Sequence, residues 1–393
     1  MNIPTAVESE PEVSVVIPCL NEADTLGTCL DKARHSLSMA GVRHEIIVAD
    51  NGSTDDSVHI AESRGARVVT VPERGYGSAL MGGIGAAKGP FVIMGDADDS
   101  YDFLECPKFA ERLRAGADIV QGCRLPSGGG TVASGAMPWT HRWIGNPMFS
   151  FLARRWFGAP IHDVYCGLRG FTRASYERLR LKCTGMEFAT EMIIKSALQG
   201  LRFAEVPITL HPDGRKAHTP HLKTVRDGWR TLRLLLMCSP NWLFILPGFT
   251  LMGAGGLGFF MALSGERLGA ISLDVHTLLF SSALFQCGYM AVAFSFIIKS
   301  IAFKEGLRKA PPSPRFLYGW FRLERGLLAG LLMAVAGLGI MLSMFWSWAE
   351  GGFGYLDYPH SMRVAIPGVT LLALGVQTGF LSFFKDSVDI WRA

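Results

Sequence analysis

The second half of the chain contains four long stretches without a charged residue, and these constrain its fold more than any other feature. Each is 21 to 24 residues long, and they cover residues 243–263, 277–298, 326–349 and 364–384. A helix needs about 20 apolar residues to cross the hydrocarbon core of a bilayer, and the core helices of soluble proteins rarely run so far without a charge. We therefore expect residues 241–393 to form four transmembrane helices.

The distribution of Lys and Arg predicts the orientation of these helices. The link between the second and third stretches holds seven basic residues, whereas the other two links contribute only Arg267 and Arg363. The positive-inside rule places the basic link in the cytoplasm, and four spans then return both termini to that side. The first residues, MNIPTAVESEPEV, do not resemble a signal peptide. We expect a multi-pass protein of the cell inner membrane with its hydrophilic half in the cytoplasm.

Residues 1–220 alternate between short apolar runs and segments with helical periodicity. The runs read as strands over residues 13–18, 44–50, 66–71, 90–96 and 117–122. Helical spacing follows several of them, and one helix is expected to begin with Ser53 as its N-cap. Strands that alternate with helices predict an α/β domain with a mostly parallel, Rossmann-like sheet. No Gly-x-Gly-x-x-Gly fingerprint follows the first predicted strand and no P-loop occurs, so a Rossmann dinucleotide site or a P-loop site is not supported.

Four carboxylates crowd the end of the fourth predicted strand, in the sequence GDADDSYD. They are Asp96, Asp98, Asp99 and Asp102. Like charges this close resist ionisation together unless a positive group is near, so the run is either a solvated loop or a cation site. Ligands of parallel sheets bind beyond the carboxyl ends of the strands, which is where Asp96 and also Asp50 fall. An Asp-x-Asp pair suits a hard divalent cation that fills its shell with diphosphate oxygens and water.

Several motifs together resemble glycosyltransferase family 2 with a GT-A fold, and specifically its polyprenyl-phosphate glycosyltransferase branch, which includes dolichol-phosphate mannosyltransferase and bacterial glucosyl relatives. The likeness covers nearly the whole hydrophilic half. It runs through VVIPCLNE, IIVADNGSTDDS, GDADD, IHDVYCGLRGFTR and GMEFATEMIIKSALQGLRFAEVPITL. The resemblance implies a metal-dependent, inverting transfer of a hexose from a nucleotide sugar to a polyprenyl phosphate. UDP-glucose is the favoured donor, with GDP-mannose second.

The resemblance also implies roles for individual residues. Mg²⁺ or Mn²⁺ is expected on Asp96 and Asp98. The nucleotide sugar is expected at Pro18, Glu22, Asp50 and Asp96. The acceptor phosphate is expected at Arg124, Arg169, Arg215 and Lys216. The last two are the nearest equivalents in DGRKAHTPH, where the family usually has an Arg and then a Ser-Lys pair. The catalytic residues are expected to be Asp163, Asp99 and Glu191, with Glu191 as a contact to the sugar.

Such a reaction needs little acid–base help from the protein. A phosphate monoester has its second pKa at about 6, so the acceptor is already largely anionic at neutral pH. Positioning and charge stabilisation are then the main requirements, and arginine forks suit both. Two basic, Trp-containing segments, 137–158 and 221–240, are candidates for amphipathic helices in the membrane interface. The second of these would separate a 1–220 domain from the spans.

Two other functions stay open at this point. A processive polysaccharide synthase of the same superfamily would carry Gln-x-x-Arg-Trp, but here Gln121 and Arg124 are followed by Leu125. A transporter or a non-catalytic membrane subunit is the other alternative, although the four spans contain no ionisable residue for a transport path. Glycines in the first and third spans would permit close helix packing, within the chain or in a homo-oligomer. The net charge of +4 and the absence of a basic, aromatic-rich arm give no reason to expect nucleic acid as a partner.

Overall fold

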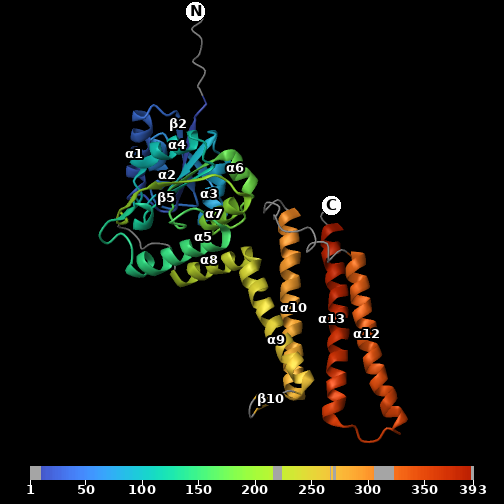
Figure 1. Ribbon diagram of the computed structural model, residues 1–393. Coiled ribbons are helices and arrows are strands. Elements are labelled where there is room, and N and C mark those ends of the chain that lie inside the picture. The colour runs from blue at the N-terminus through green and yellow to red at the C-terminus, as the bar shows by residue number, and fades with distance from the viewer. Residues whose placement is uncertain (1–9, 216–223, 266, 269–270, 305–322, 391–393) are drawn as a thin grey trace, which may run out of the picture. The chain divides into compact units, whose positions relative to one another are not determined.

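A computed structural model describes residues 10–215, 224–265, 267–268, 271–304 and 323–390 of the chain (Figure 1). These residues divide into two compact units, Met1–Cys238 and Ser239–Ala393. Lys216 and most of the basic link between the second and third spans lie outside the described residues.

The first unit is built around a mixed sheet of seven strands in its described part, in the order β3-β2-β1-β4-β7-β5-β8. The strands are β1 (Val13–Cys19), β2 (His44–Asp50), β3 (Arg67–Thr70), β4 (Phe91–Met94), β5 (Ile119–Cys123), β7 (Arg169–Thr172) and β8 (Phe203–Pro207). All neighbours are parallel except β7, which runs antiparallel to both β4 and β5. The predicted mostly parallel sheet is confirmed, whereas the antiparallel strand was not predicted. Two further short strands, β6 (Thr131–Val132) and β9 (Thr209–Leu210), pair beside the main sheet.

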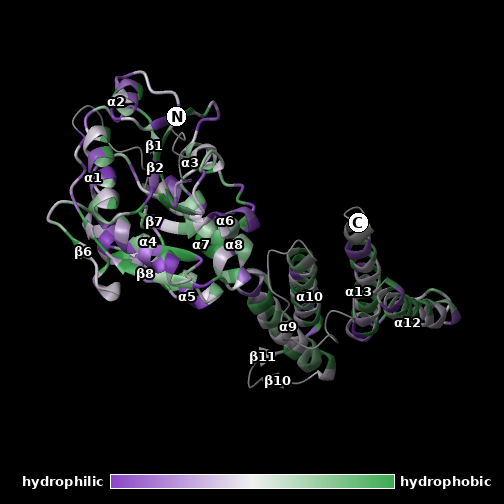
Figure 2. Cartoon of the chain, turned by 90° about the horizontal axis from the view of Figure 1, so that it is seen from above, coloured by the Kyte–Doolittle hydropathy of each residue, from purple (hydrophilic) through white to green (hydrophobic). Residues whose placement is uncertain are grey.

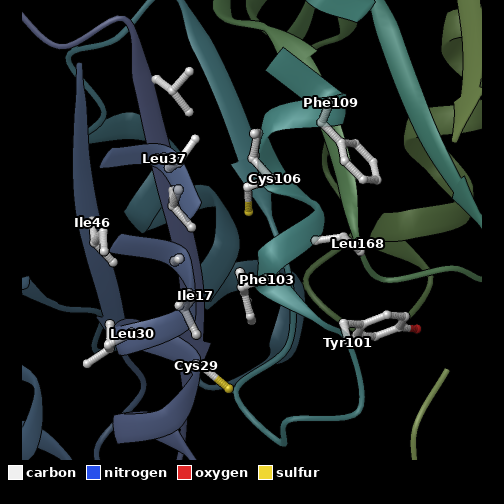
Figure 3. Packing of buried hydrophobic residues seen from close by; sticks show 14 of the residues in the cluster. Ile17, Cys29, Leu30, Leu37, Ile46, Tyr101, Phe103, Cys106, Phe109 and Leu168 are labelled. Atoms are coloured by element: carbon white, nitrogen blue, oxygen red, sulfur yellow. The ribbon is translucent and has the colours of Figure 1, made fainter. Parts of the chain in front are cut away.

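Helices cover both faces of this sheet because successive residues of a strand point to opposite faces. In β1, Val15 and Ile17 belong to one buried cluster and Val16 to the other. The first cluster, shown in Figure 3, includes side chains from α1 (Leu26–Met39), the 3₁₀ turn η1 (Phe103–Glu105) and α4 (Cys106–Arg114). The second includes side chains from α3 (Tyr76–Gly85), α5 (Asn146–Phe157), α6 (Arg173–Leu179) and α7 (Phe188–Gln199). The remaining short elements are α2 (Ser57–Ser63), the 3₁₀ turn η2 (Pro126–Gly128) and the π-helical turn η3 (His141–Gly145).

Helix α8 (Thr224–Cys238) belongs to this first unit. Its Leu235 is fully buried in the second cluster. On its outer side Arg226 and Arg233 are exposed, and so are Trp229 and Met237, at 59% and 63%. The helix is therefore amphipathic, with one face in the core of the unit and an outer face that mixes arginines with large apolar side chains.

The second unit consists of long apolar helices. They are α9 (Leu246–Ser264), which follows the π-helical turn η4 (Asn241–Ile245), then α10 (Val275–Lys304), α12 (Leu323–Glu350) and α13 (Tyr358–Ile390). A short hairpin, β10 (Arg267–Leu268) with β11 (Ile271–Ser272), lies between α9 and α10 in the chain. Four helices of the described chain are long and apolar enough to cross a membrane, as predicted, and Figure 2 shows their largely hydrophobic colouring.

Glycines let the helices of this unit pack in two close pairs, α9 with α10 and α12 with α13. A Cβ on Gly337 of α12 would lie 2.5 Å from both the carbonyl oxygen of Gly368 and the amide nitrogen of Leu372 on α13. A Cβ on Gly255 of α9 would lie 2.5 Å from the amide nitrogen of Phe285 on α10. Small residues at helix contacts are the usual way for membrane helices to gain packing energy. A hydrogen bond of 2.6 Å between the hydroxyls of Ser282 and Thr370 joins the two pairs.

Candidate active site

The predicted site residues come from loops at a single edge of the sheet. Glu22 follows β1, Asp50 ends β2, Asp96 follows β4 and Arg124 follows β5. Because β7 is antiparallel, its first residue, Arg169, lies at the same edge, opposite Met94 and Gln121 in the register. This common edge is where parallel sheets bind their ligands.

Asp96 is held in a tight environment. The hydroxyl of Tyr76 donates a hydrogen bond of 2.8 Å to its Oδ1, and a Cβ on Gly167 would lie 2.5 Å from its Oδ2. Burial and the charge of nearby Asp98 raise the pKa of Asp96 to about 6, although the Tyr76 hydrogen bond acts in the opposite direction. A positive charge that approached Asp96 would stabilise its ionised form and lower its pKa.

Asp98 is the second carboxylate that faces this edge. Its Oδ1 accepts hydrogen bonds from the backbone N–H and the hydroxyl of Ser100, at 3.0 and 2.6 Å. Its Oδ2 lies 3.4 Å from Nη1 of Arg215. Arg215 also forms a partly buried ion pair of 2.7 Å with Glu22. Burial opposes the charge of Arg215, but Glu22, Asp98 and Asp213 outweigh it and raise the pKa of the guanidinium.

The other two carboxylates of the run face away from this pair. Asp99, which was predicted to be catalytic, lies 2.8 Å from Nζ of Lys32 on α1, and its backbone is in the left-handed region with a φ of 57°. Asp102 is 3.8 Å from the same ammonium group and caps η1 by accepting the N–H of Leu104. The charge of the run is therefore divided: Asp99 and Asp102 share the single positive charge of Lys32, and Asp96 and Asp98 lie at the edge of the sheet. No contact in the described residues gives Asp99 a catalytic partner.

Asp50 and Pro18 lie near the carboxyl ends of the neighbouring strands β2 and β1, where Asp50 pairs with Cys19, the residue after Pro18. Asp50 is 5% exposed, and its carboxylate accepts the backbone N–H groups of Gly52 and Ser53 at 3.1 and 3.0 Å. Pro18 is partly exposed and pairs with Ala49 in the β1–β2 register. The predicted N-cap at Ser53 is wrong, because α2 begins only at Ser57 and the Ser53 hydroxyl accepts the N–H of Asn21 instead. This contact joins the loops after β1 and β2.

Arg124 and Asp163 are bound to each other. Two guanidinium nitrogens of Arg124 donate to the two carboxylate oxygens of Asp163, at 2.7 and 2.9 Å, and Nη1 donates to the Tyr101 hydroxyl at 3.2 Å. Arg124 is 7% exposed and Asp163 is fully buried. In this conformation each member of the pair satisfies the charge of the other.

Arg169 is fully buried and has no carboxylate partner within the described chain. It donates instead to the backbone carbonyl oxygens of Ala189 and Cys166, both at 2.7 Å, and more weakly to that of Val164. Burial lowers the pKa of this guanidinium from its usual value. In this conformation Arg169 is therefore bound to backbone carbonyl groups on both sides of its guanidinium.

Glu191 lies on α7 and is 4% exposed. Its carboxylate accepts the backbone N–H groups of Lys182 and Cys183, at 2.9 and 2.8 Å, and lies 2.7 Å from Nζ of Lys195. Burial opposes its ionisation, but these hydrogen bonds outweigh burial and lower the pKa of Glu191. Glu191 thus holds Lys182 and Cys183 at the start of the 182–184 segment.

A divalent cation fits the edge of the sheet only if a ligand completes its shell. Among the described residues no group of three or more His, Cys, Asp or Glu side chains could hold a metal. The protein can offer Asp96 and Asp98, and hard cations such as Mg²⁺ commonly combine one or two carboxylates with phosphate oxygens and water. The donor set therefore fits a cation that arrives with a diphosphate.

Sequence reasoning missed two residues at this edge. Tyr76 begins α3, and residues 71–75 separate it from the carboxyl end of β3. The rule that ligands bind beyond the carboxyl ends of strands, which singled out Asp96, points to this segment as well. Gly167 carried no such signal, because its importance depends on the proximity of Asp96 in space.

Comparison with known proteins identifies the family. The family model of glycosyl transferase family 2 matches residues 14–180. The family model of the glycosyltransferase family 2 C-terminal transmembrane region matches residues 296–388. The low-salt glycan biosynthesis hexosyltransferase Agl6 of Haloferax volcanii is 33% identical over 380 residues, which cover 96% of this chain and 89% of that protein. The dolichyl-phosphate hexose transferase of the same organism is 33% identical over 198 residues, covering 50% of this chain and 82% of that protein.

Among solved structures, glucosyl-3-phosphoglycerate synthase from Mycobacterium tuberculosis, in complex with Mn²⁺, UDP and glucosyl-3-phosphoglycerate, aligns over 58% of this chain and 78% of that chain. The identity is 24% and the TM-score 0.42. The family matches and the relative of nearly equal length agree with the parallel sheet, its acidic edge and the apolar helices. The chain belongs to glycosyl transferase family 2.

Proposed function

We propose that this protein transfers a hexose from a nucleotide sugar to a polyprenyl phosphate in the membrane. The observation that carries this proposal is the pair Asp96 and Asp98 at the ligand-binding edge of the sheet, in a chain that also has four apolar helices. The names of two relatives, a hexosyltransferase and a dolichyl-phosphate hexose transferase, support both the sugar class and the acceptor.

The donor would bind with its diphosphate at Asp96 and Asp98, together with Mg²⁺ or Mn²⁺. Such a cation, when bound, stabilises the negative charge that develops on the departing nucleoside diphosphate. Asp50 would bind the base. Its carboxylate accepts the N–H groups of Gly52 and Ser53, and a carboxylate has room for further hydrogen bonds, such as one from the base. We favour UDP-glucose as the donor and GDP-mannose as the second candidate, since uracil and guanine both offer an N–H to a carboxylate.

The acceptor would attack through a phosphate oxygen. This oxygen forms a bond to the anomeric carbon while the bond from that carbon to the diphosphate breaks, which inverts the configuration. The acceptor phosphate is already largely ionised at neutral pH, so no strong base is needed. Arg215 is the best placed cation, because it lies beside Asp98 and its side chain retains 12% exposure. Its planar fork, which here pairs with Glu22 and Asp213, would exchange these carboxylates for two oxygens of the acceptor phosphate.

The first unit would sit on the membrane through α8 and through the segment that contains η3 and α5. Both expose large apolar side chains next to arginines, with Trp143 at 56% and Phe151 at 55% in the second segment. Amphipathic surfaces of this kind lie at the boundary of headgroups and acyl chains. Each contacting arginine would add about 1 kcal/mol on anionic lipid. From the basic link between the second and third spans, we propose that this membrane face is cytoplasmic.

The test is sugar transfer by the full-length protein in detergent. Undecaprenyl phosphate and Mg²⁺ or Mn²⁺ are supplied with radiolabelled UDP-glucose, GDP-mannose, UDP-galactose or UDP-N-acetylglucosamine, each in a separate reaction. Label should move from one donor into a lipid product, and EDTA should abolish the transfer. The proposal fails if no donor labels the lipid, and a long labelled polymer would favour a processive synthase instead.

Two controls sharpen this assay. Asp98→Asn should abolish transfer while the melting temperature stays near that of the wild type, since the side chain keeps its size and lies at the surface of the site. Near-normal turnover by this variant would contradict the cation assignment. The anomeric configuration of the product, read by NMR, tests inversion separately, because retention would exclude a single displacement.

A further inference from the structure

Tyr76 has a contact that the proposed reaction does not explain. It is the first residue of α3, and its hydroxyl donates to Oδ1 of Asp96 at 2.8 Å. Within the described chain this is the only hydrogen bond that the Asp96 carboxylate receives. Tyr76 therefore determines how one of the two acidic groups at the edge is turned.

The opposite side of the same carboxylate is closed by backbone. A Cβ on Gly167 would lie 2.5 Å from Oδ2 of Asp96 and 2.9 Å from the ring of Tyr101. Gly167 is itself held, because its N–H donates to the Tyr101 hydroxyl at 2.8 Å. Asp96 thus lies between a hydroxyl that fixes Oδ1 and a glycine that leaves just enough room for Oδ2.

The position of Tyr76 depends in turn on the 182–184 segment. The carbonyl oxygen of Thr184 accepts the N–H groups of Gly77 and Ser78, at 2.9 and 3.2 Å, in the first turn of α3. These N–H groups have no partner inside the helix, so the segment takes the place of a helix cap. Gly75 and Gly77 lack the Cβ that would collide with the carbonyl oxygens of this segment.

Glu191 completes this chain of contacts from the far side. Its buried carboxylate accepts the N–H groups of Lys182 and Cys183, immediately before Thr184. Hydrogen bonds and the short backbone segments between them therefore connect Glu191, through the 182–184 segment and the start of α3, to Tyr76 and Asp96.

We propose that Tyr76 is a positioning residue of the divalent-cation site, which holds Asp96 in the orientation that binds the cation, and that Glu191 acts on the same site through Tyr76. This inference rests on the proposed role of Asp96 and Asp98. Groups that orient a metal ligand by hydrogen bonding typically change metal affinity about 10- to 100-fold when they are removed. Tyr76→Phe removes the hydroxyl and keeps the ring.

Mn²⁺ binding measures this effect without turnover. The full-length protein in detergent is titrated with Mn²⁺ in the presence of UDP and, separately, of GDP. Free Mn²⁺ is followed by electron paramagnetic resonance and corrected for the Mn²⁺ that the nucleotide binds alone. We expect Tyr76→Phe to bind Mn²⁺ about 10- to 100-fold more weakly than the wild type. Tyr176→Phe is the matched control, because it removes a hydroxyl from a ring that stacks on Phe171 in the same unit. It should bind like the wild type.

The outcomes separate this inference from the proposed function. If the wild type binds Mn²⁺ more tightly than Asp98→Asn but Tyr76→Phe equals the wild type, the cation site stands and the role of Tyr76 is refuted. If the wild type and Asp98→Asn bind equally, the cation site itself is refuted, and the role of Tyr76 with it.

A double variant tests the part played by Glu191. If Glu191 acts through Tyr76, Glu191→Ala should weaken Mn²⁺ binding in the wild-type background but add little to Tyr76→Phe, since coupled residues are not additive. Fully additive losses would overturn this part of the proposal. The Tyr76→Phe comparison stands by itself if Glu191→Ala does not fold.

Discussion

Asp163→Asn tests whether the Arg124–Asp163 pair is a structural element or a free catalytic group. Asp163 is fully buried, and its carboxylate receives two hydrogen bonds from the Arg124 guanidinium, one from the Arg124 backbone N–H and one from that of Tyr165. The substitution keeps the shape of the side chain but removes its charge. Arg124, which is only 7% exposed, then stays buried without a counter-ion.

The expected cost follows from this burial. Breaking a buried ion pair by removing one partner costs about 3–5 kcal/mol, because the remaining charge is uncompensated. For a unit of this size each kcal/mol lowers the melting temperature by about 2–4 °C. Asp163→Asn should therefore lower it by about 6–20 °C. Replacing both charges, as in Arg124→Met with Asp163→Asn, should restore part of the loss, since no buried charge is then left unpaired.

The assay is thermal unfolding of the full-length protein in detergent, followed by tryptophan fluorescence, with sugar transfer measured at a temperature where every variant is folded. Partial recovery of stability in the double variant would show direct coupling between the two residues. The structural interpretation is refuted if Asp163→Asn keeps the wild-type melting temperature but loses transfer, which is the behaviour of a catalytic carboxylate.

Three further predictions concern other parts of the molecule. Gly167→Ala should cost about 1–3 kcal/mol and reduce transfer, because its Cβ would press on Asp96; Gly85→Ala, whose Cβ meets nothing within 4 Å, should do neither. Gly337→Ile should loosen the α12–α13 pair and lower the melting temperature, whereas Gly339→Ile should leave it unchanged, since a Cβ there also meets nothing within 4 Å. The pKa of Glu191 lies below its usual 4.5, so its stabilisation is present above about pH 4.5 and is lost as pH falls through the folded pKa. The difference in melting temperature between wild type and Glu191→Gln should therefore shrink in acid, and a difference that grows would contradict this sign.

Periodicity and charge in the sequence predict the layers of this protein well. The apolar runs became strands, of which all but the half-buried β3 are largely buried on both faces, and the four uncharged stretches became long helices, because both patterns are local. Neither β7 nor its direction was predictable in this way, since its four residues, Arg-Gly-Phe-Thr, do not form an apolar run.

The ion-pair partners of the charged residues could not be predicted from the sequence either. Lys32 meets Asp99 across 67 positions, and Arg124 meets Asp163 across 39. Such pairs form only when the folded sheet brings distant loops together. For the same reason, a motif that resembles a phosphate contact could not predict that Arg169 is buried. The positions of Asp96 and Asp98 could be predicted, because they follow the end of a strand.

Helix α8 has a consequence for any attempt to separate the enzyme from its anchor. Leu235 fills part of the core of the first unit, so a fragment cut near residue 220 would lose a piece of its own interior and leave apolar surface uncovered. A fragment cut after Cys238 would keep that core but would also keep the exposed Trp229 and Met237. Detachment from the spans should therefore yield a protein that still needs lipid or detergent to remain dispersed.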